Sequence, residues 1–349
     1  MHLRTFRALF LALLALVALG AAACGGSDEE SASTGGQTTA AETEKKIRVG
    51  LVTDIGGLND RSFNALANAG LERAKAELGA ETRVLISKSN ADYVPNLTTL
   101  AQQGYDLVIP VGFLMADATN TVAKKFPDTK FAIVDFSQAA LKDKPTNVQG
   151  LLFKEQEAGY LAGYVAGLYA KDNNIKAVSS VGGQKIPPVD AYIAGYQAGA
   201  KAAFPEVETL NGYSQDFVDQ AKCREEALNQ IQRGSGVVFQ VAGQCGLGAL
   251  DAAKAEGKQG IGVDADQGYL GDHVITSALK KIDVAVFTAI QQAQEGGLQT
   301  GSDVVASVES GGVGLGKLSA EGEAYADQVK EIQDQIAAGE IADIPNEVE

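Results

Sequence analysis

Residues 50–71 read GLVTDIGGLNDRSFNALANAGL, and this stretch indicates the fold of the whole chain. The apolar run that ends at Thr53 predicts a buried strand of a parallel sheet, because such strands are covered on both faces. Two adjacent glycines then permit a sharp turn, and apolar residues recur at three- and four-residue spacing over 63–78, which predicts a helix. Either Asp60 or Ser62 can cap that helix.

The same turn gathers polar side chains at the place where a parallel sheet binds its ligands. In open parallel sheets, ligands bind beyond the carboxyl ends of the strands. Asp54, Ser62, Phe63 and Asn64 follow the strand and offer a carboxylate, a hydroxyl, an aromatic face and an amide. A single acid after a strand is more often a turn residue. The prediction of a binding site therefore depends on the presence of four such groups in one turn.

Strands and helices alternate along the chain in two series. In the first series, strands are predicted at 47–53, 83–87, 107–111 and 131–134, and helices at 63–78, 93–103 and 116–125. In the second, strands are predicted at 177–181, 209–213, 237–241 and 260–263, and helices at 191–203, 219–232 and 248–256. This order predicts an α/β protein with two doubly wound parallel sheets.

The length of the chain favours two lobes. It has 349 residues, of which 45% are hydrophobic, and this exceeds what one compact core usually holds. We assign residues 46–152 plus 272–299 to lobe 1, and residues 153–271 plus 300–349 to lobe 2. This division assumes that the chain returns to lobe 1 after the second series and that its tail closes lobe 2.

The first 45 residues predict secretion and attachment to a membrane. Residues 1–23 carry arginines, an apolar run and small residues, which is typical of a signal peptide. Cys24 follows three alanines and resembles the cysteine of a bacterial lipobox, which is lipidated and becomes the new first residue. Residues 24–45 are polar, glycine-rich and acidic, as in a flexible tether. We expect a lipid-anchored protein on the extracytoplasmic face of the cell membrane.

Charge and cysteine content narrow the possible partners. Loss of Arg4 and Arg7 with the signal peptide reduces the 29 basic residues to 27 against 44 acidic ones, a net charge of −17. No basic face is evident for phosphate contacts, so we expect no nucleic-acid partner. Cys223 and Cys245 can pair in an oxidising compartment, and we favour this disulfide over two free thiols.

The catalytic inventory is small and favours binding without chemistry. His273 is the only histidine after the signal peptide, and no histidine, cysteine and acid cluster has metal-ligand spacing. The chain also lacks a GxSxG nucleophile motif. The glycine run at 243–248 lacks the lysine of a phosphate-binding loop. We therefore expect no cofactor, no metal and no enzymatic activity.

Several sequence blocks together resemble the basic membrane protein family. They are the opening stretch, FAIVD at 131–135, EQEAGYLAGYVAG at 155–167, GIGVDADQ at 260–267 and ITSALKKIDVAV at 275–286. Members of this family are substrate-binding lipoproteins of ABC importers, and the characterised branch binds purine nucleosides. The resemblance implies a type I periplasmic-binding fold with a multi-strand hinge, and ABC permease subunits as partners. We expect a monomer.

The resemblance also implies a set of ligand-binding residues. A nucleobase would lie between two aromatic rings, one from each lobe, and these rings match Phe63 and Phe217. Polar groups would surround the base, and acids with a lysine would bind the ribose. The remaining matched positions are Asp54, Ser62, Asn64, Asp135, Gly243, Asp264 and Lys280. Asp266 is an alternative to Asp264, and Gly246 is an alternative to Gly243.

General chemistry supports the same residues and leaves other functions open. Aromatic stacking supplies affinity for any base, and carboxylates accept hydrogen bonds from ribose hydroxyls. Aromatic rings at such positions are nevertheless more often part of a core. A nucleoside hydrolase with Asp54 and Asp264 as paired carboxylates, a surface nucleoside sensor and a sugar-binding receptor are the alternatives to an importer protein.

Overall fold

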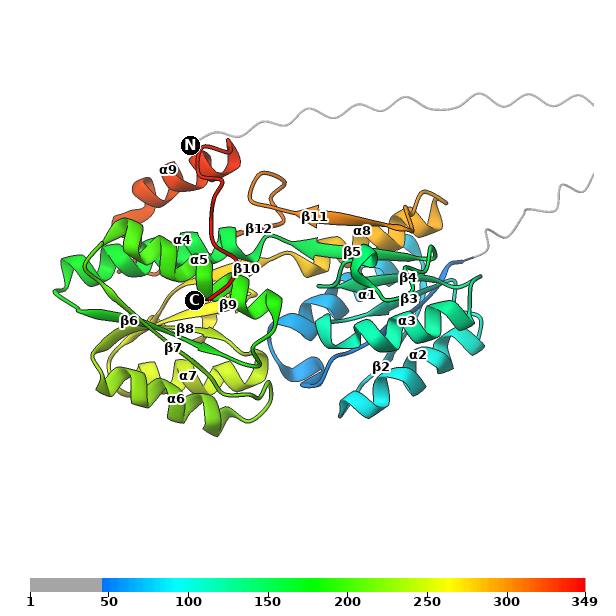
Figure 1. Cartoon of the computed structure of the whole chain (residues 1–349), viewed down its shortest axis with the longest axis horizontal. Coiled ribbons are helices and arrows are strands. Elements are labelled where there is room, and N and C mark those ends of the chain that lie inside the picture. Colours follow the sequence, from blue (N-terminus) through cyan, green and yellow to red (C-terminus); the bar gives the residue numbers. More distant parts are fainter. Residues whose placement is uncertain (1–45, 349) are drawn as a thin grey trace, which may run out of the picture. The chain divides into compact units, whose positions relative to one another are not determined.

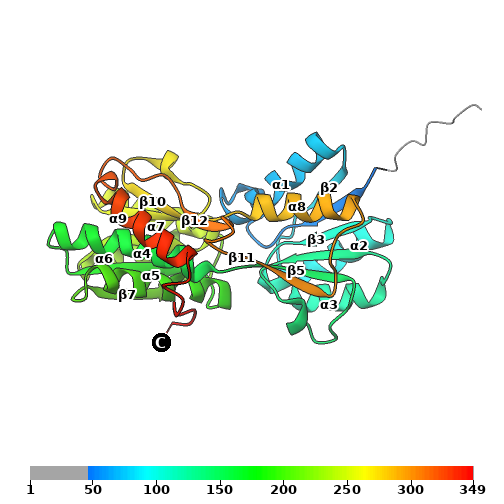
Figure 2. The same cartoon turned by 90° about the horizontal axis from the view of Figure 1, so that it is seen from above.

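The computed structural model describes residues 46–348, and within them two six-stranded sheets form the centres of two α/β lobes (Figure 1). The predicted signal peptide at 1–23, Cys24 and the predicted tether at 24–45 lie outside the described residues. The described part of the chain supports the predicted fold class, because helices cover both faces of each sheet (Figures 1 and 2).

The two sheets share one strand order. In the first sheet the order is β11-β5-β4-β3-β1-β2, with every neighbouring pair parallel. Its strands are β1 (Arg48–Val52), β2 (Glu81–Leu85), β3 (Leu107–Pro110), β4 (Lys130–Val134), β5 (Val148–Phe153) and β11 (Ser302–Ala306). In the second sheet the order is β12-β10-β9-β8-β6-β7, and only β12 is antiparallel to its neighbour within the described residues. Its strands are β6 (Ala177–Gly182), β7 (Glu208–Tyr213), β8 (Ser235–Val241), β9 (Gln259–Asp264), β10 (Val274–Lys280) and β12 (Val313–Leu315).

The helices pack in pairs against the sheets. On lobe 1 the pairs are α1 (Phe63–Leu78) with α8 (Ile282–Gln294), and α2 (Tyr93–Gln102) with α3 (Ala116–Lys125). On lobe 2 they are α4 (Glu155–Asp172) with α5 (Pro187–Ala203), and α6 (Gln220–Gln232) with α7 (Gly243–Ala255). Helix α9 (Ala326–Ala337) contacts α4. Figure 1 shows α4 and α5 on one face of the second sheet and α6 and α7 on the other.

Because the strand orders match, β4 and β9 occupy equivalent positions in the two lobes. Asp135 directly follows β4, and Asp264 is the last residue of β9. Both have a left-handed backbone, with φ of 66° and 61° respectively. A positive φ is uncommon outside glycine, although aspartate tolerates it better than most residues. Such conformations concentrate at ligand sites, where the surrounding structure enforces them.

Three chain segments cross between the lobes and form the hinge. They connect β5 to α4, β10 to α8, and β11 to β12. Backbone and side-chain hydrogen bonds join the segments: Lys154 N donates to Ala306 O at 2.8 Å, Lys281 N to Gly312 O at 2.8 Å, and Val308 N to Glu157 Oε2 at 2.7 Å. The implied multi-strand hinge is therefore present.

The lobe boundaries differ from the sequence-based assignment at two strands. Residues 272–299 are assigned to lobe 1 from the sequence, yet β10 pairs with β9 in the second sheet and only α8 packs on lobe 1. Residues 300–349 are assigned to lobe 2, yet β11 pairs with β5 in the first sheet. An apolar pattern indicates that a strand is buried but does not specify which sheet it joins, and β11 is a half-exposed edge strand with little pattern.

Candidate functional site

The carboxyl ends of both sheets border one cleft, which encloses about 620 Å³ of space including part of the open solvent. This size lies within the range of ordinary ligand pockets. All the predicted ligand-binding residues except Ser62 line it: Asp54, Phe63, Asn64, Asp135, Phe217, Gly243, Asp264 and Lys280. The structure thus brings together side chains that are more than 200 residues apart in sequence.

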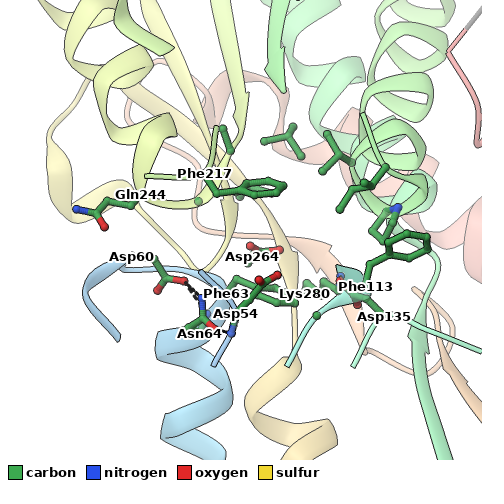
Figure 3. Close-up of a pocket in the computed structure, with 18 of the residues that line it drawn as sticks. Asp54, Asp60, Phe63, Asn64, Phe113, Asp135, Phe217, Gln244, Asp264 and Lys280 are labelled. Carbon is green, nitrogen blue, oxygen red and sulfur yellow. Dashed lines mark hydrogen bonds and ion pairs between the residues drawn. The ribbon is translucent and has the colours of Figure 1, made fainter. Parts of the chain in front are cut away.

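The two predicted aromatic rings lie on opposite sides of the cleft (Figure 3). Phe63 is the first residue of α1 in lobe 1, and Phe217 lies in the loop between β7 and α6 in lobe 2. The ring of Phe217 packs against Gly183, where an added Cβ would come within 2.2 Å of the ring. Glycine at this position therefore lets the ring lie close to the backbone. A flat group between the rings would contact both lobes.

Asp54 follows β1 and is held by a buried hydrogen-bond network. Its Oδ1 accepts hydrogen bonds from Ile55 N at 2.7 Å and from the hydroxyl of Tyr93. Its backbone N donates to Asn64 Oδ1 at 2.8 Å. Its Oδ2 lies beside Gly112, where an added Cβ would be 2.6 Å away. Burial raises the pKa of Asp54 to about 6, because the charged carboxylate loses its hydration.

Asp60, rather than Ser62, caps helix α1. The Asp60 carboxylate accepts hydrogen bonds from the backbone N of Ser62, Asn64 and Ala65. These three N–H groups lie at the start of the helix, where backbone N–H groups have no acceptor within the helix itself. The hydroxyl of Ser62 is therefore not used in capping, and it donates to Asp264 Oδ2 of the other lobe at 2.7 Å. Ser62 therefore joins the lobes through Asp264 rather than lining the cleft.

Asp264 receives hydrogen bonds from both lobes. Its Oδ1 accepts a hydrogen bond from the hydroxyl of Tyr192 at 3.2 Å, and its Oδ2 accepts the one from Ser62. Burial raises the pKa of Asp264 to about 6, whereas nearby Lys280 lowers it. This carboxylate is positioned to accept further hydrogen bonds from a ligand in the cleft.

Lys280 is the last residue of β10 and is almost fully buried, with 1% of its surface exposed. Its Nζ lies 2.6 Å from Asp135 Oδ1 and 2.8 Å from Glu155 Oε1. Burial alone would lower the pKa of Lys280, but the neighbouring carboxylates raise it above its ordinary value. The ammonium group also lies 5.3 Å from the centre of the Phe63 ring. Lys280 therefore remains charged inside the site.

Of the alternative ligand-binding residues left open by the sequence, the structure places one of each pair at the cleft. Asp266 does not line the cleft, because its carboxylate accepts hydrogen bonds from Gly268 N and Lys317 N. Gly246 packs against the side chain of Gln240. Asp264 and Gly243 are the residues at the cleft.

Sequence reasoning missed several residues of the site. They are Phe113, Tyr192 and Gln244, which line the cleft, and Glu155, which contacts Lys280 from outside it. Phe113 carried a usable signal, since it lies three residues beyond the carboxyl end of β3. Tyr192 and Glu155 reach the site from helices of lobe 2, so their positions depend on how the lobes pack.

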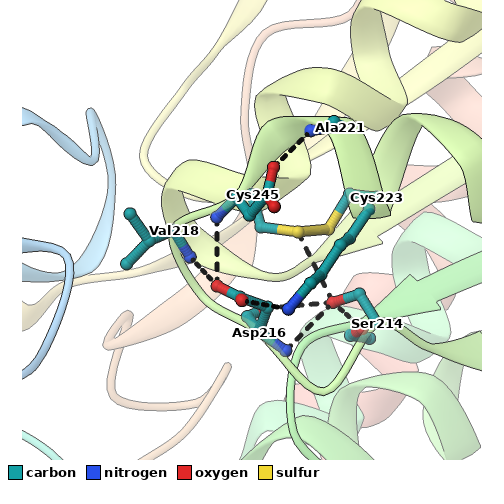
Figure 4. Close-up of polar contacts among 9 residues, drawn as sticks. Ser214, Asp216, Val218, Ala221, Cys223 and Cys245 are labelled. Carbon is teal, nitrogen blue, oxygen red and sulfur yellow. Dashed lines mark hydrogen bonds and ion pairs between the residues drawn. A yellow bond between two sulfur atoms is a disulfide. The ribbon is translucent and has the colours of Figure 1, made fainter.

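A disulfide braces the loop that carries Phe217. Cys223 in α6 and Cys245 in α7 are bonded, with Cα atoms 5.5 Å apart, as favoured from the sequence (Figure 4). Cys245 N donates to Phe217 O at 3.1 Å. Asp216 accepts hydrogen bonds from Lys222 Nζ and from Val218 N, and the bond from Lys222 is the main reason that its pKa is lowered to about 2. These contacts fix the loop relative to α6 and α7.

Residues 47–346 match the family model described as ABC transporter substrate-binding protein PnrA-like. The chain belongs to this family. It is 32% identical over 325 residues to the ABC transporter nucleoside-binding protein BmpA of Lactococcus lactis, covering 87% of this chain and 90% of that protein. It is 35% identical over 296 residues to an uncharacterised lipoprotein of Pyrococcus abyssi, covering 81% of this chain and 72% of that protein.

Solved structures agree with the family. A solute-binding protein of an ABC transporter system from Aeropyrum pernix superposes with a TM-score of 0.77 at 30% identity, covering 86% of this chain and 94% of that one. The chain is therefore an ABC transporter substrate-binding protein with two α/β lobes, and proteins of this class work with permease subunits. No helix within residues 46–348 is both long and apolar enough to cross a bilayer.

Proposed function

We propose that this substrate-binding protein binds purine nucleosides in the cleft between its lobes. The base stacks between Phe63 and Phe217, and the ribose hydroxyls donate to strand-end carboxylates. The protein then delivers the nucleoside to its permease without changing it chemically. The observation that carries this proposal is the pair of phenyl rings, one from each lobe, on opposite sides of the cleft.

The chemistry of the lining supports a neutral ligand with a flat ring and hydroxyl groups. Stacking on an aromatic ring contributes roughly 1 to 3 kcal/mol per base and tolerates any base. Figure 3 shows Asp60, Asn64 and Gln244 toward one end of the cleft, and Lys280 and Asp135 toward the other. Polar groups are thus available for both ends of a nucleoside. The name of the Lactococcus lactis relative, a nucleoside-binding protein, supports the same ligand class.

Lobe closure is part of the proposal. The hydrogen bond from Ser62 to Asp264 joins the lobes directly beside the cleft. In an open form of the protein, Ser62 and Asp264 would be too far apart for this hydrogen bond. A ligand that contacts both lobes therefore favours the closed form. A purine ring between Phe63 and Phe217 provides such a bridge.

We also propose that the mature protein is a monomer held on the extracytoplasmic face of the cell membrane by a lipid on Cys24. The sequence around Cys24 and the names of the Pyrococcus relatives, which are lipoproteins, support this location. Metabolic labelling with a radioactive fatty acid tests it. A Cys24→Ser protein should incorporate no label and should be released from the membrane.

Calorimetry with guanosine, inosine, adenosine, cytidine and free ribose tests the ligand. We expect saturable binding of at least one purine nucleoside and weaker binding of ribose, which lacks a ring to stack. If no purine nucleoside binds, the proposal is wrong. Tighter binding of ribose would favour a sugar receptor instead.

Two further measurements separate transport from the alternatives. Chromatography of a nucleoside after long incubation with the protein should show no free base, whereas a hydrolase would release it. Cells that lack the gene should take up less labelled nucleoside. Normal uptake with an altered response to nucleoside would indicate a sensor.

A further inference from the structure

Glu155 is a buried carboxylate beside the cleft that the proposed ligand contacts do not use. It is the first residue of α4, directly after the segment that crosses from lobe 1 to lobe 2. Only 6% of its surface is exposed, and it does not line the cleft. Its Oε1 accepts a hydrogen bond from Lys280 Nζ at 2.8 Å. An isolated buried charge at this place would be costly, so the pair requires an explanation.

Lys280 is held from two sides. Asp135, which lines the cleft, and Glu155, which does not, both lie within hydrogen-bonding distance of its ammonium group. An ammonium group has three donors, so two directed at these carboxylates leave one for a ligand in the cleft. Without Glu155, the ammonium would pair with Asp135 alone, and its position would no longer be determined by opposing partners.

The pair also connects two crossing segments of the hinge. Glu155 follows the β5 to α4 crossing, and Lys280 precedes the β10 to α8 crossing. Asp135 belongs to lobe 1, since it follows β4 in the first sheet. The position of the ammonium group therefore depends on how the crossing segments and lobe 1 are arranged.

We propose that Glu155 is a positioning residue that holds Lys280 at the hinge in the place from which its ammonium group reaches the ligand. This inference rests on the proposed function, because it assumes that a nucleoside occupies the cleft. Glu155 does not touch the nucleoside and affects its affinity only through Lys280.

The charged and titratable groups around Glu155 bring its titration close to neutral pH. They are Lys280 on β10, Asp135 after β4 and Tyr192 on α5, with Asp264 after β9 acting on Lys280. Burial raises the pKa of Glu155 to about 7, and the charge of Lys280 opposes this rise. Protonation of Glu155 below neutral pH should therefore weaken its ion pair with Lys280.

A double-mutant cycle tests the proposal by measuring the Kd for guanosine, inosine and adenosine. The variants are Glu155→Gln, Lys280→Met and the two combined, each checked for folding by its thermal melt. Glutamine keeps the shape of the side chain and an acceptor for Nζ, so the fold should persist. We expect Glu155→Gln to weaken binding at least about tenfold, as for loss of a buried charge partner. In the Lys280→Met background it should cause no further loss, because the two residues act through one contact.

Asp190→Asn is the matched control. Asp190 on α5 is also buried, belongs to neither the hinge nor the lining of the cleft, and contacts Tyr213 and Lys185 instead of Lys280. The same loss of charge there should leave the Kd unchanged. The Glu155→Gln protein should also lose the part of the pH dependence of binding that is centred near neutral pH, and Asp190→Asn should keep it.

The outcomes separate this inference from the function on which it depends. If the unmodified protein binds no nucleoside, the proposed function fails, and this role for Glu155 fails with it. If the unmodified protein binds a nucleoside but Glu155→Gln binds it equally well, only the positioning role is refuted. An equal loss of affinity in the native and Lys280→Met backgrounds would also refute it, because that result indicates a structural effect independent of Lys280.

Discussion

Replacement of Phe63 by alanine tests the stacking proposal most directly. The ring is half-buried at the start of α1 and lies at the cleft, opposite Phe217 (Figure 3). Loss of one stacking ring costs roughly 1 to 3 kcal/mol per base. Since about 1.4 kcal/mol corresponds to a tenfold change, the Kd for a purine nucleoside should rise by about 5- to 150-fold.

Two substitutions at the same position separate stacking from packing. Phe63→Tyr keeps an aromatic face and should retain most of the affinity, whereas Phe63→Leu keeps apolar volume without that face and should behave like alanine.

The chain contains no tryptophan, so Phe63→Trp would place a single fluorescent reporter in the cleft. Its emission should change on addition of guanosine, with a saturation curve that matches calorimetry.

The control is Phe204→Ala. Phe204 is a half-buried phenylalanine at the end of α5 that does not line the cleft. Its loss should lower the melting temperature without changing the Kd. If Phe63→Ala binds purine nucleosides as tightly as the unmodified protein, while its melting temperature falls, the ring is a core residue and the stacking argument is wrong.

Three other perturbations test separate features of the site. Asp54 and Asp264 have pKa values raised by burial to about 6, so nucleoside affinity in a calorimetric pH series should fall as acidification through pH 6 protonates the acceptors. The free energy of unfolding of the unliganded protein should change in the opposite direction. Because burial disfavours the charged carboxylates, these two groups stabilise the folded state when they are protonated at low pH. Thermal melts should show that this contribution is lost as the pH rises through 6. Ser62→Ala removes the charge-assisted hydrogen bond to Asp264 that joins the lobes, and should raise the Kd roughly tenfold and increase the radius of gyration in X-ray scattering. Reduction of the Cys223–Cys245 disulfide should destabilise lobe 2 by about 3 kcal/mol in denaturant melts, with no such effect in a Cys223→Ser/Cys245→Ser protein.

Local sequence patterns predicted most elements of the fold. The helix predicted at 63–78 coincides with α1, and the predicted strand at 107–111 contains β3 (Leu107–Pro110). Helix α5 begins at Pro187 rather than at 191, because prolines are well accepted in the first turn of a helix. Strand β11 was missed because it lies at the exposed edge of its sheet, where burial imposes little apolar pattern on the sequence. Buried elements with strong periodicity are thus readable, and edge elements are less so.

The candidate site was predictable where its residues follow strands. Asp54, Asp135 and Asp264 each lie at the carboxyl end of a parallel strand, and the known location of ligand sites in such sheets indicates them. The direction of the Ser62 side chain was not predictable, because both a helix cap and a ligand contact suit a serine there. Its actual bond to Asp264 spans 202 residues of sequence.

The α/β class, the family and the groups of residues available for binding could be inferred from the amino-acid order alone, because strand and helix periodicities and short motifs are local properties of the chain. The packing of the two lobes was needed to show which sheet receives β10 and β11, which aspartate meets Ser62, and that Glu155 contacts Lys280. These features depend on contacts between segments that are distant in sequence. Such contacts exist only once both sheets and the crossing segments between them have packed.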